Sequence, residues 1–156
     1  MNIIQKLLFS CLISFLLTTT NAQAVVTGEM VMVRSSEAFP ETMALLQEAI
    51  RNQGYELSRI QRIDVGLSAK GYETDKYRVV FFGKGKQIQE LSLKYPQLIP
   101  YLPLKIAIFA EGENTILISA NPTTYNDLFK LPELKPTFEK WLEDITQILK
   151  SVQIQN

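Results

Sequence analysis

The sequence predicts a single α+β domain with the element order β-α-β-β-α-β-β-α. Apolar residues alternate with a period of two in five segments, as in strands, and recur with helical spacing in three others. Two strand segments follow each other without an intervening helix in two places, which favours antiparallel pairing. We therefore expect a mainly antiparallel sheet with helices packed on one face, formed by residues 25–156.

The first 24 residues have the pattern of a secretory signal peptide. Lys6 precedes an apolar run from Leu7 to Leu17, and Ala22-Gln23-Ala24 provides the small-residue end of a cleavage site. The run of 11 residues is short for a membrane span, which needs about 20. We expect cleavage after Ala24, a secreted or periplasmic mature protein and no stable membrane anchor after cleavage.

The composition argues against several kinds of chemistry. The chain has no histidine, and its one cysteine, Cys11, lies inside the predicted leader. Lipidation of Cys11 is disfavoured because apolar residues continue to Leu17. The mature chain then lacks the usual zinc and copper ligands and the Ser-His and Cys-His pairs, so we expect no metal and no cofactor. Sixteen basic residues balance sixteen acidic ones, which argues against nucleic-acid binding.

The first half of the mature chain is expected to hold three strands and one helix. A strand begins near Val26, and Ser35-Ser36 is expected to cap the helix that follows. A break in alternation between Leu57 and Ile60 predicts a bulge, and the polar segment 65–75 is expected to be a loop. The strands and helix are predicted at Glu29–Arg34, Ala38–Gln53, Tyr55–Asp64 and Tyr77–Phe82.

The second half is expected to add two helices around a hairpin. Pro96, Pro100 and Pro103 predict an extended connection before the hairpin. Its first strand is apolar on both faces, which indicates cover on both sides by helices or by a second subunit. These elements are predicted at Lys86–Tyr95, Leu104–Ala110, Thr115–Ala120, a helical turn at 123–129 and a helix from Phe138 to Val152 with Pro136 in its first turn.

Three short patterns together resemble the bacterial and archaeal family called domain of unknown function 302. They are Ser35-Ser36 through Phe39 and Glu41-Thr42, Phe81-Phe82-Gly83 before a short helix, and Leu102-Pro103-Leu104-Lys105-Ile106 before the hairpin and Asn121-Pro122. The resemblance spans nearly all of the mature chain. It implies a compact α+β fold that is often dimeric, with no established activity, and it assigns no catalytic residue.

Candidate binding residues surround the proline-rich segment. Tyr77, Phe82, Tyr101 and Lys105 could line a cleft for a small amphipathic ligand, although packing around the core explains half-buried tyrosines as well. Lys84 and Lys86 in the Gly-Lys-Gly-Lys turn offer a weak anion site, but the motif departs from a P-loop because Gln87 follows Lys86.

The sequence assigns no catalytic residues. Ser35, Ser36 and Lys105 are nominal nucleophiles or bases, and the serines are explained more simply as a helix cap. Carboxylate pairs at Glu73 and Asp75, and at Glu111 and Glu113, could bind a hard cation, but solvated turn charges are the simpler interpretation because the calcium-loop pattern is absent.

Three hypotheses for function follow. The first is an exported, non-enzymatic domain that binds a small ligand or a partner protein as a homodimer. The second is a periplasmic enzyme that uses carboxylate or lysine chemistry in a cleft between segments 65–75 and 86–101. The third is a structural role in the cell envelope that requires no pocket.

Overall fold

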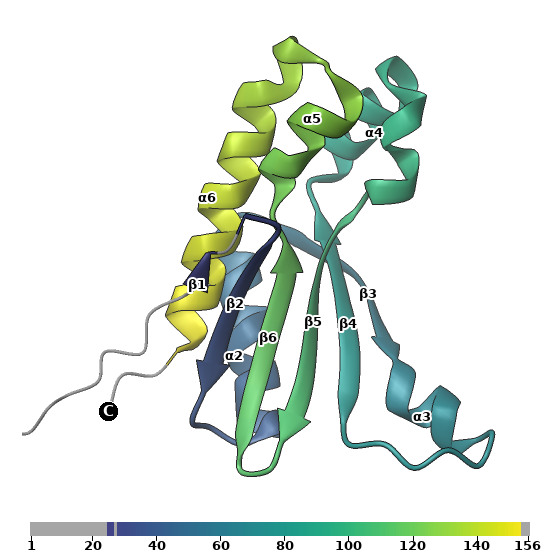
Figure 1. Cartoon of the computed structure of the whole chain (residues 1–156), viewed down its shortest axis with the longest axis vertical. Coiled ribbons are helices and arrows are strands. Elements are labelled where there is room, and N and C mark those ends of the chain that lie inside the picture. The colour runs from purple at the N-terminus through teal and green to yellow at the C-terminus, as the bar shows by residue number, and fades with distance from the viewer. Residues whose placement is uncertain (1–24, 27, 154–156) are drawn as a thin grey trace, which may run out of the picture.

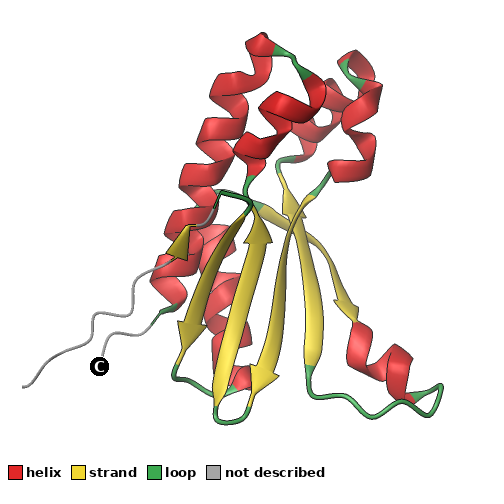
Figure 2. Ribbon diagram, in the orientation of Figure 1, coloured by secondary structure: helices red, strands yellow, loops and turns green. Residues whose placement is uncertain are grey.

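The computed structural model describes residues 25–26 and 28–153, so the predicted leader of residues 1–24 lies outside the described residues. The fold is the predicted α+β architecture, with an antiparallel sheet in the order β1-β2-β6-β5-β4-β3 (Figures 1 and 2). The strands are β1 (Val25–Val26), β2 (Met30–Ser35), β3 (Glu56–Arg62), β4 (Tyr77–Gly83), β5 (Leu104–Glu111) and β6 (Asn114–Ala120).

The helices form a layer behind the sheet and a group at one end of it, and one short helix lies at the opposite end (Figure 1). The α-helices are α2 (Phe39–Asn52), α3 (Ile63–Ser68), α4 (Gly85–Lys94), α5 (Tyr125–Phe129) and α6 (Lys135–Val152). Short 3₁₀ helices connect them: η1 (Pro96–Tyr101), η2 (Pro122–Thr124) and η3 (Pro132–Leu134). We refer to α4, η1, η2, α5, η3 and the first turns of α6 as the head, which lies beyond one end of the strands (Figure 1).

The main core lies between the sheet and helices α2 and α6, which pack on the same sheet face and against each other (Figure 1). Alternate strand residues point into it and are almost fully buried: Val31, Val33, Val80, Phe82, Ile106, Ile108 and Leu117. The apolar stripe of α6 faces them, including Ile145, Ile148 and Leu149. Burial of one such side chain contributes about 1.5–3 kcal/mol, so this layer dominates the stability of the domain.

A connected set of aromatic rings forms the core of the head. Tyr101 packs edge-on against Tyr125 and Phe129, with ring centroids 5.1 and 5.2 Å apart, and Tyr125 continues to Phe138 at 5.5 Å. Phe138 is 5.6 Å from Trp141, the single tryptophan of the chain. The head is therefore packed onto α6, which also contacts the main core.

Two predicted irregularities are present. The register of β3 against β4 shifts between Leu57 and Arg59, where the break in alternation predicted a bulge. The hairpin of β5 and β6 turns through Gly112, whose φ of +58° is in the left-handed region that glycine adopts at low cost.

The segment predicted as a loop at residues 65–75 contains most of α3, so that prediction is wrong in its first part. The Asp64 carboxylate, in the first turn of α3, forms an ion pair with Arg78 of β4. Both side chains are mostly buried, with 13% and 14% of their surface exposed. A partner 14 positions away helps to anchor this short helix. The spacing of apolar residues within the segment does not reveal such a distant contact.

The connection predicted as extended at residues 96–103 is also different, because η1 occupies Pro96–Tyr101. The φ angle fixed by proline is compatible with a helical turn, and Pro96 stands in the first turn, where a missing N–H removes no helical hydrogen bond. The Leu98 N–H donates to the Tyr95 carbonyl at 2.9 Å, which closes the first turn.

Ser35 and Ser36 do not cap α2 as predicted. Ala38 is the N-cap residue and makes no side-chain capping hydrogen bond. Instead, the fully buried Ser35 accepts the Glu37 N–H at 3.2 Å, one turn before the helix begins. Ser35 therefore shapes the connection between β2 and α2.

Candidate functional site

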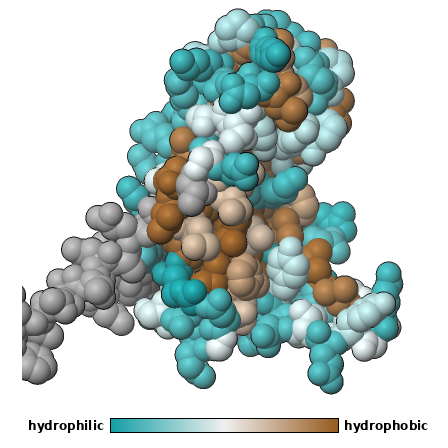
Figure 3. Space-filling model, viewed as in Figure 1, coloured by the Kyte–Doolittle hydropathy of each residue, from teal (hydrophilic) through white to brown (hydrophobic). Residues whose placement is uncertain are grey.

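The sheet face opposite α2 and α6 presents a broad apolar surface, which we call the open face. Strand alternation and register place these side chains on it: Met30, Met32, Tyr77, Val79, Phe81, Ala107, Phe109, Ile116, Ile118 and Ala120. Figure 3 views this face and shows apolar side chains at the surface over the central strands. All of them except the buried Ile116 are at least partly exposed. Soluble domains rarely expose a large contiguous apolar area, so the open face is the leading candidate for a binding surface.

Both faces of the central strands are apolar, as predicted for residues 104–110. In β5, Ile106 and Ile108 point into the main core, whereas Ala107 and Phe109 lie on the open face and are partly exposed. Met32 of β2 is 38% exposed on the same face. The apolar residues on both faces of this strand predicted cover on both sides. Among the described elements, the helical layer covers the side that holds the main core (Figure 1).

Charged side chains lie at the two ends of the open face. Arg59 and Lys105 flank Phe81 near the head, because both residues are register partners of Phe81. At the other end, the β5–β6 hairpin carries Glu111, which pairs with Arg34 of β2, and the exposed Glu113. The apolar centre therefore has a basic end and a hairpin end with an exposed carboxylate.

An apolar pocket of about 490 Å³ lies at the end of the open face away from the head. Its volume is within the range of small-molecule sites, and apolar atoms provide most of its lining. Residues from the segment before β4 and from three central strands line it: Thr74, Asp75, Lys76, Tyr77, Ala107, Phe109, Ala110 and Ile118. A smaller pocket of about 280 Å³ lies at the head end, beside Ser58, Arg59, Phe81 and Pro103.

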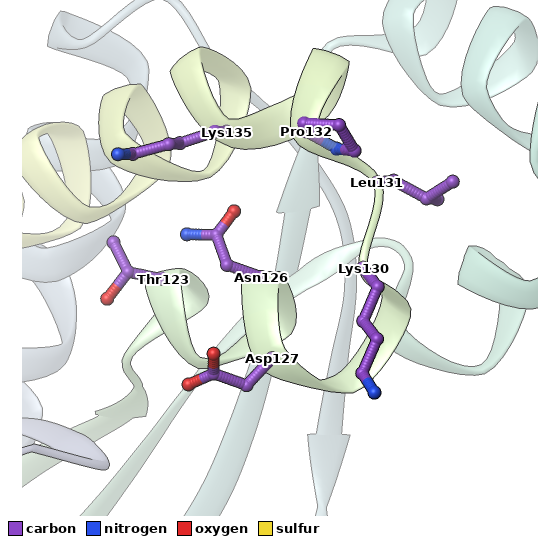
Figure 4. A pocket seen from close by; sticks show the side chains of 7 residues that line it. All are labelled: Thr123, Asn126, Asp127, Lys130, Leu131, Pro132 and Lys135. Atoms are coloured by element: carbon purple, nitrogen blue, oxygen red, sulfur yellow. The ribbon is translucent and has the colours of Figure 1, made fainter.

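A pocket of about 570 Å³ with a mixed polar and apolar lining lies in the head between α5 and the start of α6, lined by Thr123, Asn126, Asp127, Lys130, Leu131, Pro132 and Lys135. Figure 4 shows that Lys130 and Lys135 extend in opposite directions, so their ammonium groups do not converge on a shared point. Lys130 also has a left-handed backbone with φ of +52°. Without converging charges, this pocket is a weaker candidate than the open face.

The four predicted ligand-binding residues do not line one cleft. Tyr77 and Lys105 lie on the open face, at its hairpin end and its head end respectively. Phe82 is fully buried behind the sheet, where its ring packs edge-on against Tyr55 at 5.4 Å. Tyr101 belongs to the aromatic core of the head. Of the four, Tyr77 lines the larger apolar pocket.

The predicted weak anion site is a solvent-exposed turn at the start of α4. The Lys84 ammonium lies 4.6 Å from the centroid of the Tyr55 ring, and Lys86 is 3.9 Å from Glu90 one turn along the helix. Each lysine therefore has a local partner. Gly83, directly before this turn, is tightly packed, since a Cβ there would lie 2.2 Å from Ile88 Cδ1.

The nominal catalytic residues are also separated. Ser35 is buried beside α2, whereas Lys105 is exposed on the open face. Segments 65–75 and 86–101, between which an enzymatic cleft was predicted, lie at opposite ends of the sheet (Figure 1). Within residues 25–26 and 28–153, no group of three histidine, cysteine, aspartate or glutamate side chains is arranged to hold a metal ion.

One buried polar contact links Tyr55, directly before β3, to α6. The Tyr55 hydroxyl donates to Asp144 Oδ2 at 2.9 Å, and the Lys140 ammonium lies 3.0 Å from Asp144 Oδ1. Burial and the neighbouring carboxylate raise the pKa of the Tyr55 hydroxyl, so it stays protonated and donates. This contact lies behind the sheet and stabilises the layer that holds the open face.

Sequence reasoning did not single out Val79, Phe81 and Ile118, which join Ala107 and Phe109 on the open face, or Ile116, which lies on the same face but is buried. Their alternation was visible, and it grouped Ala107 with Phe109 on one face of their strand. Which face the helices cover depends on tertiary packing.

In the part of the chain that the structure describes, no helix is both long and apolar enough to cross a bilayer.

Comparison with known proteins gives a family and a fold. The family model described as domain of unknown function DUF302 matches residues 31–152. A solved structure, of an uncharacterized conserved DUF302 protein from Bacillus stearothermophilus, is similar with a TM-score of 0.74. It has 16% sequence identity over 81% of this chain and 100% of its own, so the likeness shows a shared fold. Comparison with curated proteins finds no match.

Proposed function

The chain belongs to the DUF302 family, and on that premise we propose that it is an exported, non-enzymatic binding domain that acts as a homodimer through the open face. The observation that carries this proposal is the apolar surface over the central strands, opposite the helical layer (Figure 3). Burial of such a surface against a second protein removes apolar area from water and favours association.

The distribution of charge supports a second copy of the same chain as the partner. In a two-fold arrangement with the strands of the two copies running in opposite directions, the head end of one face lies over the hairpin end of the other. Arg59 and Lys105 of each copy would then lie near Glu113 of its partner. The same surface is thus complementary to itself, which favours a closed dimer over an open chain of subunits.

Native mass spectrometry tests export and association in one measurement. The full chain, expressed with its leader in a secreting host, is expected to yield a protein that begins at Val25 and has the mass of two subunits. A mass that retains residues 1–24 would contradict export, and a monomer at micromolar concentration would contradict the dimer.

A pair of matched variants locates the interface. Ile118→Arg places a charge at the centre of the open face and is expected to weaken the dimer by about tenfold or more, because the charge must be desolvated on association. Leu93→Arg is the control, since Leu93 is 78% exposed on α4, in the head. Met32→Glu provides a second change on the open face at a more exposed position, in case Ile118→Arg does not fold.

Equal association of the two arginine variants would show that the dimer forms elsewhere. Circular dichroism and thermal unfolding establish that each variant is folded before its association is compared.

A further inference from the structure

The larger apolar pocket of the open face has the construction of a site for a flat ring. Ala107 and Ile118 are register partners on adjacent strands. Tyr77 and Phe109 are also register partners, and their rings meet edge-on with centroids 6.5 Å apart. The methyl side chain of Ala107 leaves space beside the two rings, which contributes to the volume of about 490 Å³.

The charge beside this pocket is negative. Asp75 lines the pocket, and among the described residues no side chain forms an ion pair or hydrogen bond with its carboxylate. Lys76 lines it too, but its ammonium lies 6.0 Å from the centroid of the Phe39 ring, and Phe39 begins α2 on the other side of the sheet. The pocket therefore combines aromatic walls with one carboxylate whose charge is not offset locally.

We propose that this pocket binds a small aromatic cation, with its ring between Tyr77, Phe109 and Ala107 and its positive group beside Asp75. Aromatic side chains attract cations through the negative faces of their rings, and the Asp75 carboxylate adds direct charge attraction. The same carboxylate would repel an anionic ring.

This inference rests on the proposed function in that the pocket belongs to the binding surface proposed there. The contacts to Asp75 and to the two rings come from one copy of the chain, so they do not require the dimer.

The test uses three probes that share a ring system and differ in charge: 1-naphthylmethylammonium, 1-naphthalenemethanol and 1-naphthoate. Isothermal titration calorimetry of the mature domain is expected to show the tightest binding for the ammonium probe and the weakest for the carboxylate. Equal affinities, or tightest binding of 1-naphthoate, would overturn the inference.

Two variants assign the binding to the pocket. Asp75→Asn is expected to lower the affinity for the ammonium probe by about threefold to fivefold and to leave the affinity for the neutral probe unchanged. Glu113→Gln is the matched control, because it removes an exposed carboxylate that does not line the pocket. Ala107→Leu is expected to fill the pocket and to abolish binding of all three probes. Unchanged binding in Ala107→Leu or Asp75→Asn would place the probe elsewhere and overturn the inference.

Sedimentation velocity on the same samples separates the two proposals. A dimer that binds no probe contradicts the aromatic-cation site alone. A monomer that binds the ammonium probe with the predicted dependence on Asp75 contradicts the dimer alone.

Discussion

Replacing Tyr55 by phenylalanine removes a single hydroxyl group from the buried contact between the residue before β3 and α6. The Tyr55 ring would keep its edge-on contact with Phe82 and its place beneath the Lys84 ammonium. Asp144 Oδ2 would lose its donor at 2.9 Å, in a side chain of which 4% is exposed. The perturbation therefore isolates one hydrogen bond to a buried carboxylate.

The expected cost follows from that geometry. A hydrogen bond to a charged group contributes about 1.5–3 kcal/mol, and loss of one partner leaves the other desolvated. The Lys140 ammonium remains 3.0 Å from Asp144 Oδ1 and keeps part of the charge compensated. We expect Tyr55→Phe to lower the free energy of unfolding by about 2 kcal/mol, which for a domain of this size lowers the Tm by about 6–10 °C.

Urea unfolding followed by Trp141 fluorescence measures this change. Trp141 is the single tryptophan and lies on α6, the helix that holds Asp144, so its signal reports the same layer. Tyr72→Phe is the control, because Tyr72 is 62% exposed and its hydroxyl has little to lose. A Tyr55→Phe variant within about 0.5 kcal/mol of wild type would refute the reasoning that this hydrogen bond stabilises the layer.

Two further changes test local packing and charge. Gly83→Ala is expected to lower the free energy of unfolding by about 1 kcal/mol, because the new Cβ would lie 2.2 Å from Ile88 Cδ1. Ile88→Val removes that atom. In calorimetric melting, the double variant should therefore recover part of the lost stability. The hydrogen bond from Arg78 lowers the pKa of Asp64, so the pair stabilises above the ordinary aspartate pKa and loses this effect as pH falls through the lower folded-state pKa. Asp64→Asn should therefore cost about 1 kcal/mol at pH 7 and progressively less below about pH 4, and a cost that does not change with pH would contradict this assignment.

Much of the fold could be predicted because its elements carry strong periodic signals. The stripe of Ile145, Ile148 and Leu149 in α6 and the alternation of β5 are long enough to define element type. The irregular position in β3 was also visible, since one residue out of step breaks a period of two.

The elements that were missed depend on distant or ambiguous causes. Helix α3 has six residues, and the Asp64–Arg78 pair that helps to hold it joins positions 14 apart. In η1, proline was interpreted as a source of extended chain, although its fixed φ also suits a helical turn. Ser35 accepts a hydrogen bond before the helix and not at its N-cap, a difference of three residues that composition cannot resolve.

The candidate site was predicted only in part, for a related reason. Tyr77 and Phe82 differ by an odd number of positions on one strand, so alternation separates their faces. Because β4 is apolar on both faces, the sequence does not show which one the helices cover. The apolar character of Ala107 and Phe109 was clear, whereas their position on an uncovered surface follows from the packing of α2 and α6 on the other side.

The most direct test of the open face as the dimer interface is a measurement of thiol protection. Residues 25–156 contain no cysteine, so single cysteines can be introduced in that part of the chain at Ala107 and, as a control, at Leu93. Alkylation rates are then measured over a range of protein concentrations that spans dissociation of the dimer. We predict that Ala107→Cys reacts more slowly as the concentration rises, whereas Leu93→Cys reacts at one rate throughout. A rate for Ala107→Cys that stays constant while sedimentation shows dimers would contradict the account.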